Sequence, residues 1–203
     1  MEKKRSFLGL TAACFGNLTF ALVMSLIVST SFGLLIKTKN PDVPVKVLSD
    51  YYTSGIFLLL FIQLLCLIML ICLLYVLFWN EGNKDYNLIE TGHMKNDRFK
   101  GLKVSLLAMS PGFLLNAVLV FTRLGLLKID GMFSVYKLFN NVFYGIYSIV
   151  APGFDLMNTG WAQIILLFVI QMVVPAASWL CYWLGLKRIN LIERLVYKKQ
   201  SNG

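Results

Sequence analysis

Ionised side chains are scarce in this sequence, and they are missing from the middle of its longest apolar runs. Only 14% of the 203 residues are Asp, Glu, Lys or Arg, whereas 58% are hydrophobic, and the mean hydropathy is +0.70. An ordinary soluble domain has about 25% charged and about 45–50% apolar residues. The composition therefore excludes such a domain and predicts an all-α polytopic membrane protein, a single membrane domain covering residues 1–203.

Residue types that catalyse reactions or bind metals are also few. The sequence has one histidine and four cysteines, and all four cysteines lie in apolar runs without metal-binding or redox spacing. It has no HExxH motif, no paired carboxylates inside the apolar runs, and no Ser–His–acid set at matching depth. We therefore expect no catalytic residue, no metal site and no cofactor, and we expect the protein not to be an enzyme.

Positive charge, by contrast, is in excess, with a formal net charge of +9. Because the sequence leaves no room for a basic soluble domain, we expect no nucleic-acid partner. The partner that this charge favours is the lipid bilayer, including its anionic headgroups.

Four apolar runs are long enough to cross a membrane as helices, which takes about 20 residues each. They cover about residues 7–36, 55–79, 102–121 and 160–184. The first run begins like a secretory signal but continues far beyond the 7–15 residues of a signal core. We expect it to be an uncleaved first transmembrane helix.

The distribution of lysine and arginine predicts the orientation. The two termini and the 79–103 connection carry 13 of these residues, and the other two connections carry six. We therefore expect a multi-pass protein of the cell membrane with both termini in the cytoplasm. The charged stretch at 79–103 is then a cytoplasmic turn.

Residues 132–150 do not fit the four-span scheme. Their small or polar positions recur at helical spacing, which predicts a helix with a narrow polar stripe. A fifth crossing would place the basic tail outside, so we expect an additional helix in the outer interface or partly re-entrant, ended by Ala-Pro-Gly at 151–153. The tail at 190–199 is predicted to form a cytoplasmic amphipathic helix. The stripe consists of Ser134, Lys137, Asn141, Gly145 and Ser148.

Three amides, Gln63, Asn116 and Gln171, lie at depths that would let them share one polar layer inside the bundle. A lipid-facing amide would leave unsatisfied groups that cost several kcal/mol, so we expect all three to point inward. One interpretation is a binding site for a neutral or zwitterionic solute. The other, which we favour because no charged residue accompanies the amides, is hydrogen bonding that only holds helices together.

Two prolines interrupt predicted spans. Pro111 and Pro175 each remove a backbone donor, so a kink is expected at both. Such a kink can be a hinge or a broken-helix binding point, as in transporters, or a static bend, which we favour. On the first span, Ser25, Ser29 and Gly33 form a row of small residues that lets a second helix approach closely.

In the charged turn, Gly82 is expected to stop the second helix in a left-handed conformation. Glu81 or Asp85 would then pair with Lys95 or Arg98 on the surface, where such pairs contribute little stability.

The single histidine, His93, has acidic neighbours at helical spacing, Glu90 and Asp97. Gly92 and Asn96 weaken any helix here, so a solvated histidine in a loop is the favoured interpretation over a metal ligand. The turn is nevertheless the largest polar surface predicted on the cytoplasmic side, so it is a candidate docking surface for a partner. Its candidate docking residues are Glu81, Asp85, His93, Asp97 and Arg98.

Two stretches on the cytoplasmic side, "FWNEGNKDYNLIETGHMKNDRFKGLKVSLLAMSPG" and "LGLKRINLIERLVYKK", resemble small four-span membrane proteins of Gram-positive bacteria, a group without an assigned activity. The resemblance implies a bacterial cell membrane and a four-helix topology. It identifies no functional residues.

The sequence thus leaves two functional hypotheses ahead of a membrane enzyme. The first is a non-enzymatic accessory or interaction subunit, whose partner would be another membrane protein. The alternative is a small permease or a solute-binding transporter subunit that uses the amides and the proline kinks.

Overall fold

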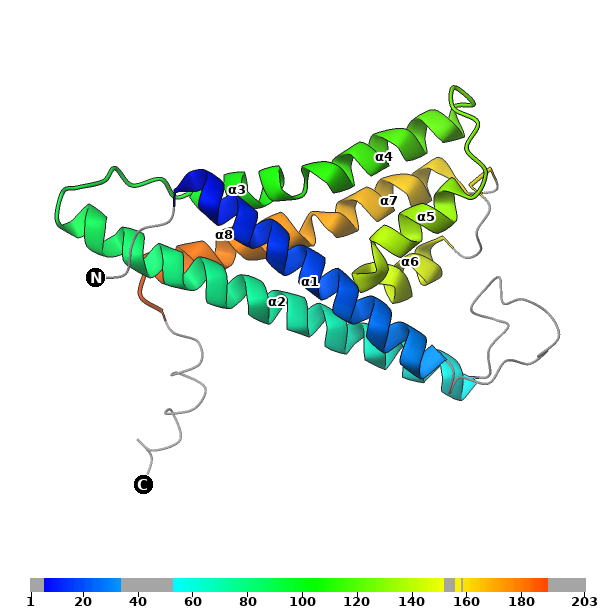
Figure 1. Ribbon diagram of the computed structural model, residues 1–203, viewed down its shortest axis with the longest axis horizontal. Helices are drawn as coiled ribbons and strands as arrows, with labels where there is room; N and C mark the ends of the chain where they lie inside the picture. The colour runs from blue at the N-terminus through cyan, green and yellow to red at the C-terminus, as the bar shows by residue number, and fades with distance from the viewer. Residues whose placement is uncertain (1–5, 34–52, 152–155, 158, 190–203) are drawn as a thin grey trace. The chain divides into compact units, whose positions relative to one another are not determined.

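The regular structure in the described part of the chain is entirely helical (Figure 1). The computed structural model describes residues 6–33, 53–151, 156–157 and 159–189. The predicted tail helix at 190–199 lies outside these residues. The helices are α1 (Phe7–Gly33), α2 (Thr53–Glu90), α3 (Lys100–Ala108), α4 (Ser110–Arg123), α5 (Met132–Phe139), α6 (Tyr144–Val150), α7 (Trp161–Gln171) and α8 (Val173–Leu186), with a 3₁₀ turn, η2 (Asn141–Phe143).

Several of these helices are long and apolar enough to cross a membrane. Among the described residues there are three, Phe7–Phe32, Gly55–Glu90 and Trp161–Leu186, and a fourth results if the bent pair α3 and α4 forms one span. The all-helical membrane class predicted from composition is thus supported, with three or four candidate spans.

Two of the helix interruptions lie close to a proline. Met109 separates α3 from α4, and Pro111 occupies the first turn of α4. Met172 separates α7 from α8, three residues before Pro175. Because proline has no N–H and its ring clashes with the preceding turn, a regular helix cannot continue unchanged through either position.

The chain divides into two compact units. Unit 1 consists of Met1–Cys14, Ile71–Ala108 and Val174–Gly203, and unit 2 consists of Phe15–Leu70 and Met109–Val173. Each unit has its own buried side chains. In unit 1 these include Leu74, Phe78 and Val104, and in unit 2 they include Leu119 and Leu167.

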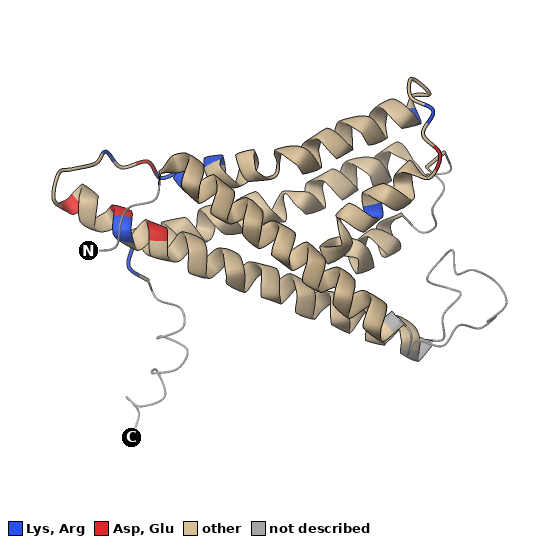
Figure 2. Ribbon diagram, in the orientation of Figure 1, with Lys and Arg blue, Asp and Glu red and all other residues tan. Residues whose placement is uncertain are grey.

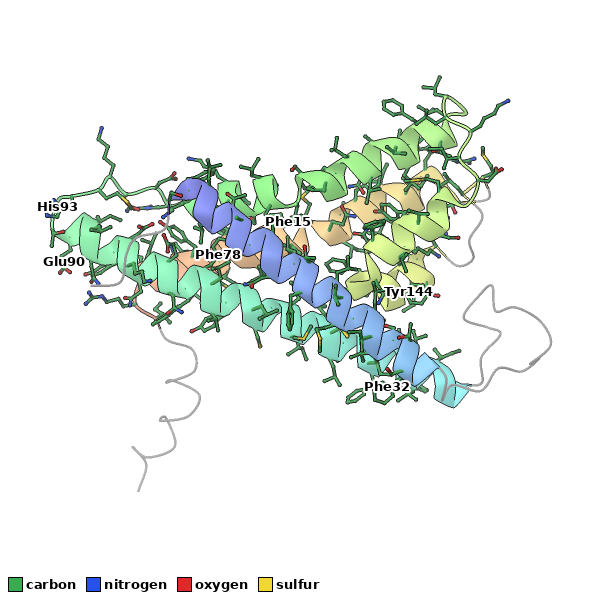
Figure 3. All side chains as sticks on the ribbon, viewed as in Figure 1. Phe15, Phe32, Phe78, Glu90, His93 and Tyr144 are labelled. Atoms are coloured by element: carbon green, nitrogen blue, oxygen red, sulfur yellow. The ribbon has the colours of Figure 1, made fainter. Side chains whose placement is uncertain are left out.

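Many large apolar side chains, in contrast, are exposed. Phe15 and Phe32 on α1 are exposed, whereas Phe78 on α2 is buried (Figure 3). Water-facing surfaces rarely carry so many exposed phenylalanine and leucine side chains, whereas a lipid-facing surface requires them.

In unit 1, α2 and α8 approach each other at two glycines. A Cβ on Gly82 would meet the carbonyl oxygen of Tyr182, and a Cβ on Gly185 would meet the carbonyl oxygen of Trp79. Glycine is therefore required here for close packing. Gly101 of α3 is equally restricted, because its Cβ would lie 2.8 Å from the carbonyl oxygen of Ser178 on α8.

The expectation that Gly82 ends the second helix was wrong. Helix α2 runs on to Glu90, and the left-handed residue that follows its end is Gly92, with φ of +74°. The hydropathy drops at Asn80, but the helix continues because Gly82 allows it to pack on α8. At about 1.5 Å per residue, α2 with its 38 residues is longer than the ~30 Å thickness of the hydrocarbon core.

The C-terminal end of α8 is closed by its own backbone hydrogen bonds, and it is also hydrogen-bonded to α2. Ile189 N donates to Leu184 O and Arg188 N to Gly185 O, which is the Schellman pattern that closes a helix. Arg188 takes the left-handed position, with φ of +52°, where glycine is usual. The Trp79 indole N–H donates to Ile189 O at 2.8 Å.

In unit 2, α5 and α6 form a hairpin that packs on α4 and α7 (Figure 1). The expectation of one helix over residues 132–150 was wrong, because the helix breaks at Asn140 and η2. The Asn140 side-chain amide donates to Tyr136 O at 3.0 Å. A short amide that bonds to the backbone in this way competes with helix continuation.

Candidate functional site

Charged residues in the described part of unit 1 gather on the last turns of α2 and the start of α3 (Figure 2). Three of them are buried together. The Lys100 Nζ lies 3.1 Å from Glu81 Oε1 and 2.5 Å from Asp85 Oδ2. The Tyr182 hydroxyl donates to the same Asp85 oxygen at 2.8 Å. We call these four residues the ion cluster.

The position of the ion cluster follows from helix geometry. Glu81 and Asp85 are four residues apart on α2, so their side chains share one face. Because α3 begins at Lys100, its ammonium group reaches both carboxylates. Glu81 and Asp85 retain only 3% and 0% of their exposure. A buried cation of this kind is tolerated because it is paired.

The ion cluster corrects the expected surface pairing of Glu81 and Asp85 with Lys95 or Arg98. Their partner is Lys100, and the two carboxylates are buried. The physical reason is the continuation of α2 through Gly82, which carries both acidic residues along the packed face of the helix. A docking surface on this turn would therefore consist of His93, Asp97 and Arg98.

Those three residues lie in the connection between α2 and α3, where His93 and Arg98 are exposed and Asp97 is partly exposed. Glu90 and His93 lie where the chain leaves α2, and His93 does not share a helical face with Asp97 (Figure 3). Within the described ranges, no group of three or more His, Cys, Asp or Glu side chains is arranged to hold a metal ion.

Asp97 lies three residues before the start of α3. Its Oδ1 accepts a hydrogen bond from Phe99 N at 3.1 Å, and its Oδ2 lies 2.8 Å from Lys103 Nζ. The hydrogen bond from Lys103 is the main reason that the pKa of Asp97 lies below its ordinary value of 3.8.

Unit 2 contains a second set of polar residues that are joined by hydrogen bonds. Every member of this set is neutral. The Asn116 amide on α4 donates to Gln171 Oε1 on α7 at 2.8 Å. The Gln171 Nε2 in turn donates to Tyr136 OH at 3.0 Å and to Asn140 Oδ1 at 2.9 Å. Gln171 thus joins α4, α7 and the α5 side of the hairpin.

The neighbouring residue in the hairpin extends the set to α1 and α2. Asn141 Nδ2 donates to Ser25 Oγ at 2.8 Å and to Ser29 Oγ at 3.2 Å. Gln63 Nε2 donates to the same Ser29 oxygen at 2.9 Å. Gly145 of α6 packs on Gln63, since its Cβ would lie 3.1 Å from Gln63 Cβ.

We call these residues the amide network. Its two halves meet at the hairpin tip, because Asn140 belongs to one half and Asn141 to the other. The network connects side chains from six elements. Its members are Ser25, Ser29, Gln63, Asn116, Tyr136, Asn140, Asn141 and Gln171.

Each half of the amide network retains one unmet acceptor. Within the described part of the chain, Gln63 Oε1 and Asn116 Oδ1 are buried without a hydrogen-bond donor. The two residues keep only 5% and 7% of their exposure. A buried amide oxygen without a donor is costly, so each oxygen is suited to bind a donor from outside the protein.

Lys137 lies in α5 one turn before the hairpin tip, and it is also buried. Its Nζ donates to Ala151 O, just beyond the end of α6, at 2.7 Å, and lies 4.6 Å from the centroid of the Phe133 ring. A lysine is favoured near the carbonyl end of a helix because the helix dipole is negative there.

The three predicted amides therefore belong to one network, although they do not form one directly bonded layer. Asn116 and Gln171 are bonded to each other, and Gln63 lies in the other half. Sequence reasoning missed Tyr136 and Asn140. The pair of asparagines in the middle of an apolar segment was the signal for Asn140.

No protein-family model, curated protein or solved structure matches this chain.

Proposed function

We propose that this chain is a multi-pass protein of a bacterial cell membrane with four crossings, both termini in the cytoplasm, and α5–α6 as a re-entrant hairpin. The hairpin tip supports this topology. Gln171 lies near the middle of the apolar stretch Trp161–Leu186, and it bonds to Asn140 at the tip. The hairpin would thus end at mid-membrane depth, where an interrupted helix is stable only if protein or a polar cavity surrounds it.

We further propose that unit 2 binds a small uncharged or zwitterionic solute, as a small permease or a solute-binding transporter subunit. The observation that carries this proposal is that two hydrogen-bonded groups, eight neutral polar side chains in all, meet at Asn140 and Asn141, with two buried amide oxygens that have no donor among the described residues. Broken membrane helices beside polar groups are typical of transporter binding sites. Gln171 directly precedes such a break at Met172.

The second candidate is the non-enzymatic accessory subunit that the sequence alone favours. It is supported by the many hydrogen bonds that the amide network makes within itself, since such a network can simply hold helices together. The exposed His93 and Arg98 and the partly exposed Asp97 would then offer a polar surface to a partner.

Thermal unfolding of the purified chain in detergent, with and without a panel of uncharged and zwitterionic solutes, tests solute binding. A ligand that binds only the folded state raises the unfolding temperature. We expect Gln63→Met to abolish the shift because it removes the unmet oxygen while keeping the volume. Gln163→Met is the matched control, because it makes the same change on α7 at a residue outside the amide network, so the shift should remain.

If no solute of the panel shifts the unfolding temperature, the binding proposal is wrong. The accessory function makes a different prediction, which is a stoichiometric partner after purification from the native host in mild detergent. Isolation as a lone monomer would contradict the accessory function.

A further inference from the structure

We infer that the amide network is selective for an uncharged solute that donates hydrogen bonds through N–H or O–H groups, and that Lys137 excludes cations from it. This inference rests on the proposed function. It narrows the solute class from uncharged or zwitterionic compounds to uncharged hydrogen-bond donors.

The donor requirement follows from the chemistry of the unmet atoms. Both unmet atoms of the amide network, Gln63 Oε1 and Asn116 Oδ1, are acceptors, within the residues that the structure describes. The amide nitrogens of the same two residues already donate to Ser29 and Gln171. A solute that only accepts hydrogen bonds would leave both oxygens without a donor, whereas an amide or a polyol would satisfy them.

The exclusion of cations follows from the charges nearby. Carbonyl oxygens can also bind a cation, but a buried cation needs a compensating negative charge. The described part of unit 2 has no buried carboxylate, and its buried ionisable cation is Lys137. The ammonium group of Lys137 lies at Ala151 O, beyond the end of α6, so it adds positive charge to unit 2 and a second buried cation there would be repelled.

Lys137 also has a structural role, which is compatible with the exclusion of cations. Its hydrogen bond to Ala151 O joins the last turn of α5 to the residue that follows α6. The same bond fixes the ammonium group within unit 2, so its charge acts through space on a solute bound in the unit.

Two pairs of solutes with different chemistry test the inference. Acetamide and acetamidinium have the same heavy-atom arrangement, and only the second is a cation. Glycerol donates hydrogen bonds, whereas glycine betaine is a zwitterion without N–H or O–H donors. We expect acetamide and glycerol to raise the unfolding temperature, and acetamidinium and betaine to bind at least about tenfold more weakly.

Variants of Lys137 separate its charge from its hydrogen bond. Lys137→Gln removes the charge and can still donate to Ala151 O, so we expect acetamidinium to gain at least about tenfold in affinity while acetamide changes little. Lys137→Arg keeps the charge and should continue to exclude acetamidinium. If Lys137→Gln does not fold, wild-type selectivity between acetamide and acetamidinium still tests the class of solute.

The outcomes distinguish this inference from the proposed function. If betaine binds and acetamide does not, a solute site exists but the donor requirement is wrong. If acetamidinium binds wild-type protein as well as acetamide does, exclusion of cations is wrong. If none of the four probes and no other solute binds, the unmet oxygens are satisfied by water only, and both proposals fail.

Discussion

The two units bury polar groups in opposite ways. Unit 1 buries ions, with Lys100 between Glu81 and Asp85, whereas the amide network of unit 2 is neutral. The ion cluster lies on the polar end of α2, beyond the apolar stretch, where headgroups and water are near in the proposed topology. At mid-membrane depth the cost of a charge is highest, and the groups that meet at the hairpin tip are amides and hydroxyls. The buried cation in the described part of unit 2, Lys137, has its ammonium group at the carbonyl of Ala151 instead.

The comparison predicts that unit 1 is more sensitive to the loss of one partner. Lys100→Met leaves two buried carboxylates without their cation, so we expect it to lower the free energy of unfolding by about 3–5 kcal/mol. Reversible denaturant unfolding in detergent micelles measures this. Lys103→Met, which removes a pair whose side chains are 57% and 43% exposed, should cost less than about 1 kcal/mol.

A triple variant sharpens the same prediction. Replacing the three ions with Glu81→Gln, Asp85→Asn and Lys100→Met together should recover part of the stability, because no unpaired charge remains. Equal losses in the single and the triple variant would contradict the electrostatic explanation.

Glycine substitutions compare the packing of the two units. Gly82→Ala places a Cβ against the backbone of α8, which cannot move alone. We therefore expect the free energy of unfolding to fall by about 2–3 kcal/mol. Gly145→Ala in unit 2 meets side-chain atoms, Gln63 Cβ and Cγ at 3.1 Å and Leu60 Cδ2 at 3.3 Å, rather than backbone, and should cost less. Gly16→Ala, with no atom within 4 Å of its Cβ, should be neutral or stabilising. The same unfolding assay ranks them, and an equal cost at Gly82 and Gly16 would contradict the close approach.

In unit 2, Gln171→Leu removes the residue that joins three partners. We expect the free energy of unfolding to fall by about 1–2 kcal/mol, which is less than for Lys100→Met, because the partners left behind are neutral. Combining it with Asn116→Leu should cost less than the sum of the two single changes, since the pair shares one hydrogen bond. Strict additivity would show that this bond contributes nothing.

The smallest expected effect concerns pH and the exposed pair of Asp97 and Lys103. The pKa of Asp97 is lower in the folded state, so its contribution is present above the ordinary aspartate pKa and is lost as the pH falls through the folded value. We expect a loss of at most about 0.5 kcal/mol below about pH 4, because the pair is partly solvated. Asp97→Asn should remove this part of the pH dependence, and an unchanged pH profile would contradict it.

Much of the fold could be predicted from local sequence. The long apolar runs, the breaks near Pro111 and Pro175, and the inward position of Gln171 all follow from residues close together in the chain. The end of α2 and the break at Asn140 could not be predicted in this way. Gly82 is a helix breaker by propensity, and only contact with α8 makes it a helix residue.

The sequence by itself determined that this protein is helical and suited to a membrane, because hydropathy over about 20 residues is a local property. Only the tertiary structure decided which polar groups meet. Lys100 pairs with Glu81 and Asp85, and Gln171 donates a hydrogen bond to Asn140. The reason is physical. A buried polar side chain must find a partner, and that partner depends on which helix faces come together, which the spacing of residues along one chain does not specify.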